Sequence, residues 1–388
     1  MVHSEPPERA LLLDALSLAA DIEVTLVSRE PLGAGAVAGF DVRAVGEPAT
    51  YFIDTSERRV DRETGLLQGS PDAPEVRVWL HPSDPHLPAL APVAFAHAAA
   101  SLLARLGIED IGTPEIVAYR PGRRAVLRVD ARDAPVWIKV VPPSRLARIV
   151  DVHRHLVSAG LPIPALLGWS ETGLLVIGNA AGVPAAEAPW TPDGFVSEVD
   201  DLRARLARLT LNHSARTHLE RRLDWYAERL AAVLPADAAA VAAAVANRAR
   251  AVNSPEPAES VHGDLHFGQL FLDDRHQIVG VIDVDTAGTG VRSADSGAFI
   301  AHAVASALLT AAPRDVRVWQ LARVAFERWD VSEGPSVRSR AATHLLGHTL
   351  GAWEATHHDR ALALLAMADA VSHGDAAALD ASTPGPSL

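Results

Sequence analysis

The order of strand-forming and helix-forming segments is the feature of this 388-residue sequence that most constrains its fold. Alternating or β-branched runs, separated by Gly, Pro and Asp, occupy residues 23–30, 39–45, 49–55, 75–80, 116–120, 125–129 and 136–141. From about residue 195 the pattern is helical, except for one non-helical stretch between about residues 260 and 294. Strands grouped before helices are typical of an α+β fold.

Composition shifts divide the chain into four parts. Residues 1–88 are β-rich and end in the proline-rich segment H-P-S-D-P-H-L-P. Residues 89–182 begin with an Ala-rich helix and continue with strands, and residues 183–375 are mainly helical. The segment 376–388 closes with A-S-T-P-G-P-S-L, and we expect it to be a flexible tail. The length is sufficient for two or three subdomains with cores of their own.

Charge and composition exclude several classes of protein. The net charge of −13 argues against a nucleic-acid partner, because such interfaces need basic surface. The absence of cysteine excludes disulfides, thiolate zinc sites and cysteine nucleophiles. The first residues lack the basic start of a signal peptide, and no window holds about 18 apolar residues in a row. We therefore expect a cytoplasmic protein with no membrane segment.

The non-helical stretch carries the strongest chemical signal. It reads S-V-H-G-D-L-H-F-G-Q and then I-V-G-V-I-D-V-D-T. The apolar segments 270–272 and 278–282 flank the turn D-D-R-H-Q, which predicts a hairpin. A hairpin would gather Asp264, Gln269 and Asp283 at one place. Carboxylate and amide oxygens suit Mg²⁺, and an additional Asp near the metal could accept a hydroxyl proton.

The motif H-G-D-L-H-F-G-Q followed by I-D-V-D resembles those of the aminoglycoside phosphotransferase and choline kinase superfamily, the small-molecule branch of the protein-kinase-like fold. The resemblance covers approximately residues 110–370. It implies a bilobal α+β fold, with a five-stranded small lobe and hinge in residues 89–182 and a helical large lobe in residues 183–375. The β-rich segment 1–88 would be an additional, cap-like part.

The resemblance also assigns roles to residues of the motif. Asp264 corresponds to the catalytic base. Asp283 and Gln269 correspond to the Mg²⁺ ligands, although most members have Asn where this chain has Gln. The resemblance places three further residues in support of this loop, namely His262, Asp285 and Asp295.

Lys139 is the only lysine among the 35 basic residues of the chain. It lies in the strand V-W-I-K-V-V, the third strand of the predicted small lobe. In the resembling family this strand carries the lysine that binds the α- and β-phosphates of the nucleotide. Arginine is longer and planar and does not replace a compact ammonium at such a site. One lysine kept at this position favours the kinase interpretation.

Other nucleotide contacts are implied with less sequence support. Arg123 and Arg124 lie in the turn P-G-R-R, which is either the family's phosphate loop or an ordinary solvated turn. Asp151 is the only carboxylate between residues 140 and 170, and it would pair with Lys139 where the family has Glu. The hinge that binds the purine would run from Ile177 past Asn179. Backbone recognition of the base leaves ATP and GTP equally open.

The departure at Gln269 resembles the motif of maltokinases and actinobacterial glucosamine kinases, which favours a sugar or aminosugar acceptor. Candidate acceptor contacts are His266, near the catalytic Asp, and Trp329, Trp353 and Glu354 on the C-terminal helices.

Three alternatives stay open or are set aside. A nucleotide-binding pseudokinase with a regulatory role is the main competitor, because the family Glu and Asn are both replaced. A protein kinase is disfavoured by the absence of G-x-G-x-x-G, D-F-G and A-P-E motifs, so a small acceptor is expected. His344 and His348 have the i,i+4 spacing of a metal-binding helix. Leu345 replaces the glutamate of H-E-x-x-H and the sequence indicates no third ligand, so we predict a packed helix face.

Overall fold

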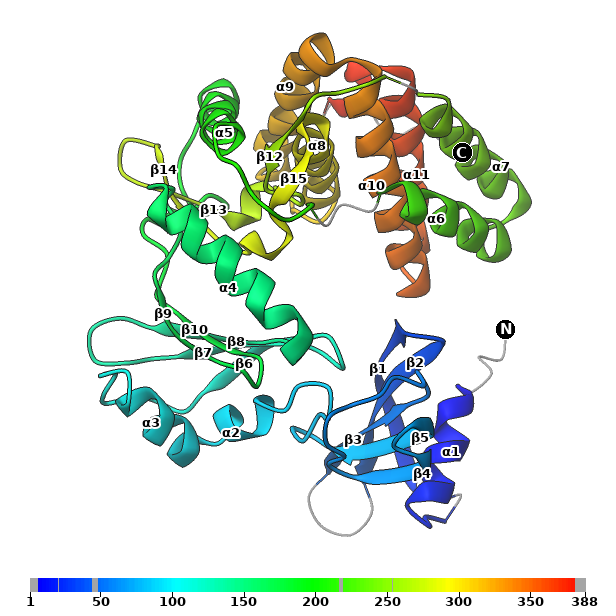
Figure 1. Cartoon of the computed structure of the whole chain (residues 1–388). Helices are drawn as coiled ribbons and strands as arrows, with labels where there is room; N and C mark the ends of the chain where they lie inside the picture. Colours follow the sequence, from blue (N-terminus) through cyan, green and yellow to red (C-terminus); the bar gives the residue numbers. More distant parts are fainter. Residues whose placement is uncertain (1–5, 20, 44–47, 216–218, 253, 381–388) are drawn as a thin grey trace. The chain divides into compact units, whose positions relative to one another are not determined.

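The computed structural model describes residues 6–19, 21–43, 48–215, 219–252 and 254–380. The chain forms two compact units, the first made of Met1–Val150 with Ala165–Asn179 and the second of Asp151–Pro164 with Ala180–Leu388. The two units contain the mixture of helices and antiparallel sheets that the predicted α+β class requires (Figure 1). No helix within the described residues combines the length and the apolar character that a membrane span requires.

The first unit begins with helix α1 (Pro7–Ala15) and an antiparallel sheet in the order β1-β2-β3-β5-β4 (Figure 1). Its strands are β1 (Glu23–Leu32), β2 (Gly35–Arg43), β3 (Ala49–Asp54), β4 (Leu66–Ser70) and β5 (Ala73–Leu80). The turn between β1 and β2 contains Gly33 at a φ of 57°, so the glycine-rich run that starts there forms a β-hairpin. Strand β4 escapes prediction because it is an edge strand with mostly exposed residues.

A second antiparallel sheet completes the first unit, in the order β6-β7-β8-β10-β9. Its strands are β6 (Glu115–Arg120), β7 (Arg124–Val129), β8 (Val136–Val140), β9 (Leu166–Ser170) and β10 (Leu174–Ile177). Helix α4 (Pro143–Ser158) connects β8 to β9. The predicted helix before the sheet is split into α2 (Leu90–Ala94) and α3 (Ala96–Ala104) by the extended backbone of Phe95. Five strands are the number that the family resemblance implies.

The second unit contains two small sheets and most of the helices. Strands β11 (Val183–Pro184), β13 (Leu270–Leu272) and β14 (Ile278–Val281) form one sheet, and β12 (Ala258–Val261) pairs with β15 (Gly288–Val291). The helices are α5 (Pro192–Ala207), α6 (Leu219–Val233), α7 (Ala236–Ala251), α8 (Arg292–Ala307), α9 (Asp315–Glu333), α10 (Pro335–Glu354) and α11 (His358–His373). Short 3-10 turns lie at Phe267–Gln269, Val284–Thr286 and Ala376–Leu379.

The core of this unit is built by α8, α10 and their neighbours, which are rich in Ala and Leu. Gly297 permits a close crossing of α8 and α10, because a Cβ there would lie 2.5 Å from the Cβ of Arg340. The 3-10 turn Ala376–Leu379 buries Leu379 completely, so the first residues of the predicted tail pack on the second unit. The remainder of the predicted tail, residues 381–388, lies outside the described residues.

Candidate active site

The loop 262–269, called here the H-G-D loop, connects strand β12 to strand β13. Strand β12 leads into it and pairs with β15, with Val261 opposite Gly288. Asp295, at the start of α8 and 2% exposed, accepts hydrogen bonds from the backbone N–H of His262 at 2.8 Å and of Gly263 at 2.7 Å. A buried carboxylate that accepts two backbone N–H groups fixes the start of the loop.

A second set of contacts ties the H-G-D loop to the segment 282–286. Thr286 Oγ1 donates to the carbonyl of His262 at 2.8 Å, and His262 Nε2 lies 3.3 Å from the carbonyl oxygen of Ile282. Gly263 has a φ of +87°, and a Cβ there would lie 2.8 Å from the carbonyl of Thr286. Glycine is therefore required in H-G-D by both conformation and space.

The predicted hairpin is present and joins β13 to β14, with Leu270 opposite Val281. The backbone N–H of Ile282 donates to the carbonyl of Gln269 at 3.0 Å, so Gln269 and Asp283 lie at the same end of the hairpin. Asp283 adopts a left-handed conformation, with a φ of 59° and a ψ of 42°. Strained conformations of non-glycine residues concentrate at functional sites, which supports the selection of Asp283.

The side chains at this end of the hairpin have the chemistry of a Mg²⁺ site. Asp283 and Asp285 are both partly exposed and supply hard carboxylate oxygens. Gln269 is 3% exposed, and its Oε1 accepts the backbone N–H of His266 at 3.0 Å. An amide oxygen has two acceptor positions, so one remains for a metal. The residues present thus fit the ion, with Gln269 also holding the loop.

The Asp264 side chain is 42% exposed, and its Oδ1 lies 3.7 Å from Nε2 of His302 on α8. Burial raises the pKa of Asp264, but interactions with His302, His344 and His262 lower it by more. The pKa therefore lies well below the ordinary value, and the carboxylate is ionised at neutral pH.

Four histidines gather beside Asp264 and are called here the histidine cluster. They are His266 from the H-G-D loop, His302 from α8, and His344 and His348 from α10. The ring centroid of His302 lies 4.4 Å from that of His266, 4.8 Å from that of His348 and 6.2 Å from that of His344. The sequence reveals the spacing of His344 and His348 but gives no sign of His302, an isolated histidine in an Ala-rich helix.

Burial is the main cause of lowered basicity in the histidine cluster. It lowers the pKa of His344 to about 3 and those of His266 and His348 to about 4. Electrostatic interaction with His302 lowers all three pKa values further, while nearby carboxylates oppose the shift. Three neutral imidazoles at neutral pH can each donate and accept one hydrogen bond.

Helix α6 borders the same region. A Cβ at Gly347 of α10 would lie 2.7 Å from Cζ of Tyr226, so the Tyr226 ring packs on α10 between His344 and His348. Burial raises the pKa of Tyr226, with a further contribution from the charge of Asp264. Tyr226 is therefore a candidate site residue, and no sequence motif indicated it.

The comparison with family models agrees with this geometry. Residues 47–330 match the phosphotransferase enzyme family, abbreviated APH. The chain belongs to this family. It is therefore a phosphotransferase, an enzyme that transfers phosphate to a hydroxyl acceptor. The finer resemblance to maltokinases stays a prediction, and no curated protein matches the chain.

Two solved structures of aminoglycoside phosphotransferase APH(4)-Ia show the same fold, and a third solved structure is less similar. A thermostable mutant of aminoglycoside phosphotransferase APH(4)-Ia, in its apo form, has a TM-score of 0.53 and 19% identity, covering 73% of this chain and 99% of that one. Its ternary complex with ADP and hygromycin B has a TM-score of 0.51 and 17% identity, covering 71% and 97%. A choline/ethanolamine kinase family protein from Mesorhizobium loti has a TM-score of 0.46 and 20% identity, covering 69% and 92%.

In the first unit of this phosphotransferase, Lys139 lies on β8, in register with Val126 of β7 and Leu175 of β10. The lysine is 7% exposed and occupies a central strand of the sheet. At the end of β10, Asn179 Oδ1 accepts the indole N–H of Trp137 at 3.1 Å. The nucleotide contacts of Lys139, Ile177 and Asn179 stay predictions.

The turn between β6 and β7 is held by the N-terminal segment of the same unit. Asp84, buried at 1% exposure, accepts the backbone N–H of Gly122 at 2.8 Å and the Tyr119 hydroxyl at 2.9 Å. Arg123 donates to the carbonyl of Pro31 and lies 3.6 Å from Glu30. The predicted phosphate turn is thus fixed by residues before 88, a connection the sequence does not indicate.

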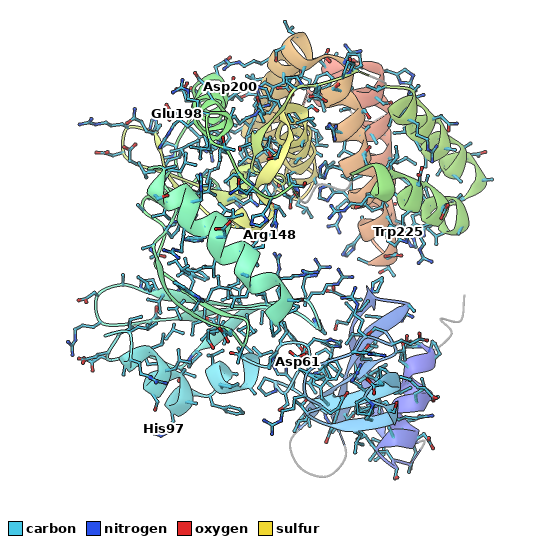
Figure 2. All side chains as sticks on the ribbon, viewed as in Figure 1. Asp61, His97, Arg148, Glu198, Asp200 and Trp225 are labelled. Carbon is cyan, nitrogen blue, oxygen red and sulfur yellow. The ribbon has the colours of Figure 1, made fainter. Side chains whose placement is uncertain are left out.

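The C-terminal candidates for acceptor binding differ in how far they are buried. Trp329 is 1% exposed, and its indole N–H donates to Asp200 of α5 at 2.8 Å (Asp200 is labelled in Figure 2). The prediction that Trp329 contacts substrate is therefore wrong, because the residue belongs to the core. Trp353 stacks on His358 at 4.2 Å, and Glu354 is exposed and pairs with Arg229 at 2.9 Å. Both stay predictions.

Asp151 lies on the part of α4 that belongs to the second unit. Its carboxylate lies 3.0 Å from Nε2 of His213 and is 64% exposed. The predicted pairing of Asp151 with Lys139 stays a prediction.

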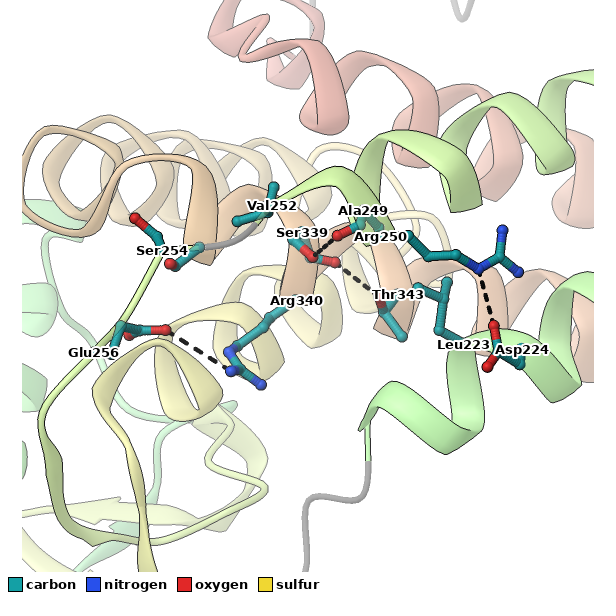
Figure 3. A pocket seen from close by; sticks show the side chains of 11 residues that line it. Leu223, Asp224, Ala249, Arg250, Val252, Ser254, Glu256, Ser339, Arg340 and Thr343 are labelled. Carbon is teal, nitrogen blue, oxygen red and sulfur yellow. Dashed lines mark hydrogen bonds and ion pairs between the residues drawn. The ribbon is translucent and has the colours of Figure 1, made fainter.

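A cavity of about 340 Å³ lies elsewhere in the second unit, between the ends of α6 and α7 and one face of α10 (Figure 3). Its two arginines are already paired, Arg340 with Glu256 at 3.7 Å and Arg250 with Asp224 at 2.9 Å. None of the predicted site residues lines it. The cavity therefore offers no unpaired charge to a phosphate or carboxylate ligand.

Proposed function

We propose that this protein is a small-molecule kinase that transfers the γ-phosphoryl group of ATP or GTP to a hydroxyl of a sugar or aminosugar. The observation that carries the proposal is the ionised Asp264 on a loop that Asp295 locks in place. The complex of APH(4)-Ia with ADP and hygromycin B supports a nucleotide donor and a small acceptor.

Asp264 would accept a hydrogen bond from the acceptor hydroxyl and orient its oxygen for in-line attack. Because its pKa is low, Asp264 is a weak base, and orientation would contribute more than early proton removal. Lys139 would bind the nucleotide phosphates. Asp283, with Gln269, would hold Mg²⁺, which when bound neutralises charge on the phosphates.

The groups around Asp264 favour a neutral, hydroxyl-rich acceptor over a polycation. His266, His344 and His348 are uncharged at neutral pH and can exchange hydrogen bonds with hydroxyls. A polycationic aminoglycoside calls instead for a surrounding of carboxylates. Sugars and lightly aminated sugars are therefore the acceptors to test first.

The test is nucleotide diphosphate release with Mg²⁺ and ATP or GTP, across monosaccharides, aminosugars, malto-oligosaccharides, aminoglycosides and choline. We expect acceptor-dependent turnover with a sugar and a loss of at least about 100-fold in kcat for Asp264→Asn. Asp274→Asn is the matched control, because Asp274 is an exposed carboxylate in the turn of the adjacent hairpin.

Full turnover in Asp264→Asn would contradict the assigned role. Nucleotide binding without turnover on any acceptor would favour the competing hypothesis, a regulatory pseudokinase.

A further inference from the structure

Three potential metal ligands meet at the catalytic carboxylate, each from a different element. A carboxylate oxygen of Asp264 and one ring nitrogen each of His302 and His344 all lie within 4.8 Å of one another. The three side chains come from the H-G-D loop, α8 and α10. The close crossing of α8 and α10 at Gly297 places these two helices near enough for their histidines to approach each other.

The imidazoles are available to bind a ligand. Among the described residues, the ring nitrogens of His344 and His348 make no hydrogen bond, and His302 contacts only the Asp264 carboxylate through its ring nitrogen. A neutral imidazole presents a lone pair, which is the form that binds transition metals.

We propose that Asp264, His302 and His344 form a binding site for a divalent transition-metal ion of the zinc class, distinct from the Mg²⁺ site. Two imidazoles and one carboxylate are the ligand set of zinc sites that keep an open fourth position. Tetrahedral zinc with bonds of about 2.1 Å holds its ligand atoms roughly 3.4 Å apart. Displacements of about 1 Å in the ligand atoms, produced by side-chain rotation, would bring the three atoms to that spacing. His348, one turn along α10, or a water would take the fourth position.

An ion at this site would occupy the carboxylate that we assign to the acceptor hydroxyl. Zinc would then inhibit phosphotransfer by withdrawing Asp264 from the acceptor. Hard oxygen ligands select Mg²⁺, whereas imidazoles select zinc and its neighbours in the first transition row. Mg²⁺ would therefore bind at Asp283, and zinc would bind at the histidines. The inhibition rests on the proposed function, and the binding does not.

The test is a titration of the untagged, full-length protein with Co²⁺ in the presence of excess Mg²⁺. Excess Mg²⁺ occupies the oxygen site at Asp283 and leaves the histidine site to Co²⁺. We expect one equivalent of Co²⁺ with the visible absorption of a tetrahedral complex, displaced by Zn²⁺. His302→Gln and His344→Gln should each weaken binding by at least about tenfold, and His276→Gln, in an exposed turn, should bind like wild type.

Absence of Co²⁺ binding in the wild type, or wild-type binding in both variants, overturns the proposal. Thermal unfolding without metal shows whether the variants fold, and His302→Gln keeps the test valid if His344→Gln does not, because the His302 side chain is 26% exposed. Inhibition by Zn²⁺ is measured in parallel against the rate of each protein with Mg²⁺ and no Zn²⁺. If no acceptor gives turnover, the proposed function fails while the Co²⁺ spectra still decide the metal site.

Discussion

Asp283 has a left-handed backbone conformation that is unfavourable for most L-residues. The residue has a φ of 59°, a region that costs most L-residues about 1 kcal/mol but that Asn and Asp tolerate. Asp283→Asn keeps this tolerance and removes the charge, whereas Asp283→Ala loses both. We expect both variants to lose phosphotransfer by at least about 100-fold, and only Asp283→Ala to lose about 1 kcal/mol of unfolding free energy relative to wild type.

Urea unfolding and nucleotide diphosphate release measure the two effects separately. Equal stability of the Asn and Ala variants would show that the left-handed conformation carries no cost. Undiminished activity of Asp283→Asn would remove Asp283 from the metal site.

At the scale of elements, the segment that follows β5 holds the turn between β6 and β7 through Asp84. In wild type, Asp84 accepts hydrogen bonds from the backbone N–H groups of Gly122 and His86. In Asp84→Asn one carboxylate oxygen becomes an NH₂ group, so one of these two N–H groups would face another donor. An unpaired buried donor costs about 1–3 kcal/mol, and we expect that loss in the stability of the variant. If the turn covers the nucleotide phosphates, KM for the nucleotide rises several-fold while kcat changes less.

Steady-state kinetics in nucleotide and thermal unfolding check this prediction. Asp72→Asn is the control, because Asp72 has an 89% exposed side chain in a turn of the same sheet. A change in stability with no change in nucleotide KM would mean that Asp84 only supports the fold.

At the scale of the whole molecule, the pH dependence of stability should report His81, which lies between the two sheets of the first unit. Its ring centroid lies 4.9 Å from that of Tyr119 on β6 and 6.0 Å from that of Phe52 on β3. Burial lowers the pKa of His81 below its ordinary value of 6.5. As pH falls below about 6.5, His81 takes up a proton in the unfolded chain before it does so in the folded chain. The contribution of His81 to the free energy of unfolding is therefore fully present above about pH 6.5 and is lost as pH falls toward the pKa of the folded state.

Replacement of His81 by Phe keeps the aromatic packing and removes the titration. We expect the melting temperature of His81→Phe to fall less steeply than that of wild type between pH 6.5 and 5. His97→Gln, on the exposed surface of α3 (Figure 2), should keep the wild-type slope. Equal slopes in wild type and His81→Phe would exclude His81 as the source.

Local patterns were sufficient for the elements that carry strong periodicity or turn signals. The hairpin 270–282 and the strand of Lys139 were predicted because alternation and flanking turn residues are local properties. Strands β4 and β9 were missed, since one is mostly exposed and the other is short and contains Gly168. Trp329 was misassigned because aromatic residues of core and binding site look alike in sequence.

The sequence by itself determined the α+β class, the H-G-D loop with its hairpin, and the kinase family, because the spacing of those residues within short segments fixes their chemistry. Only the tertiary structure decided that Asp295 anchors the loop, that Asp84 holds the turn at Gly122, and that His302 and His344 meet at Asp264. These contacts join residues about 30 to 80 positions apart. Their meeting depends on how helices and sheets pack, and no local pattern records that packing.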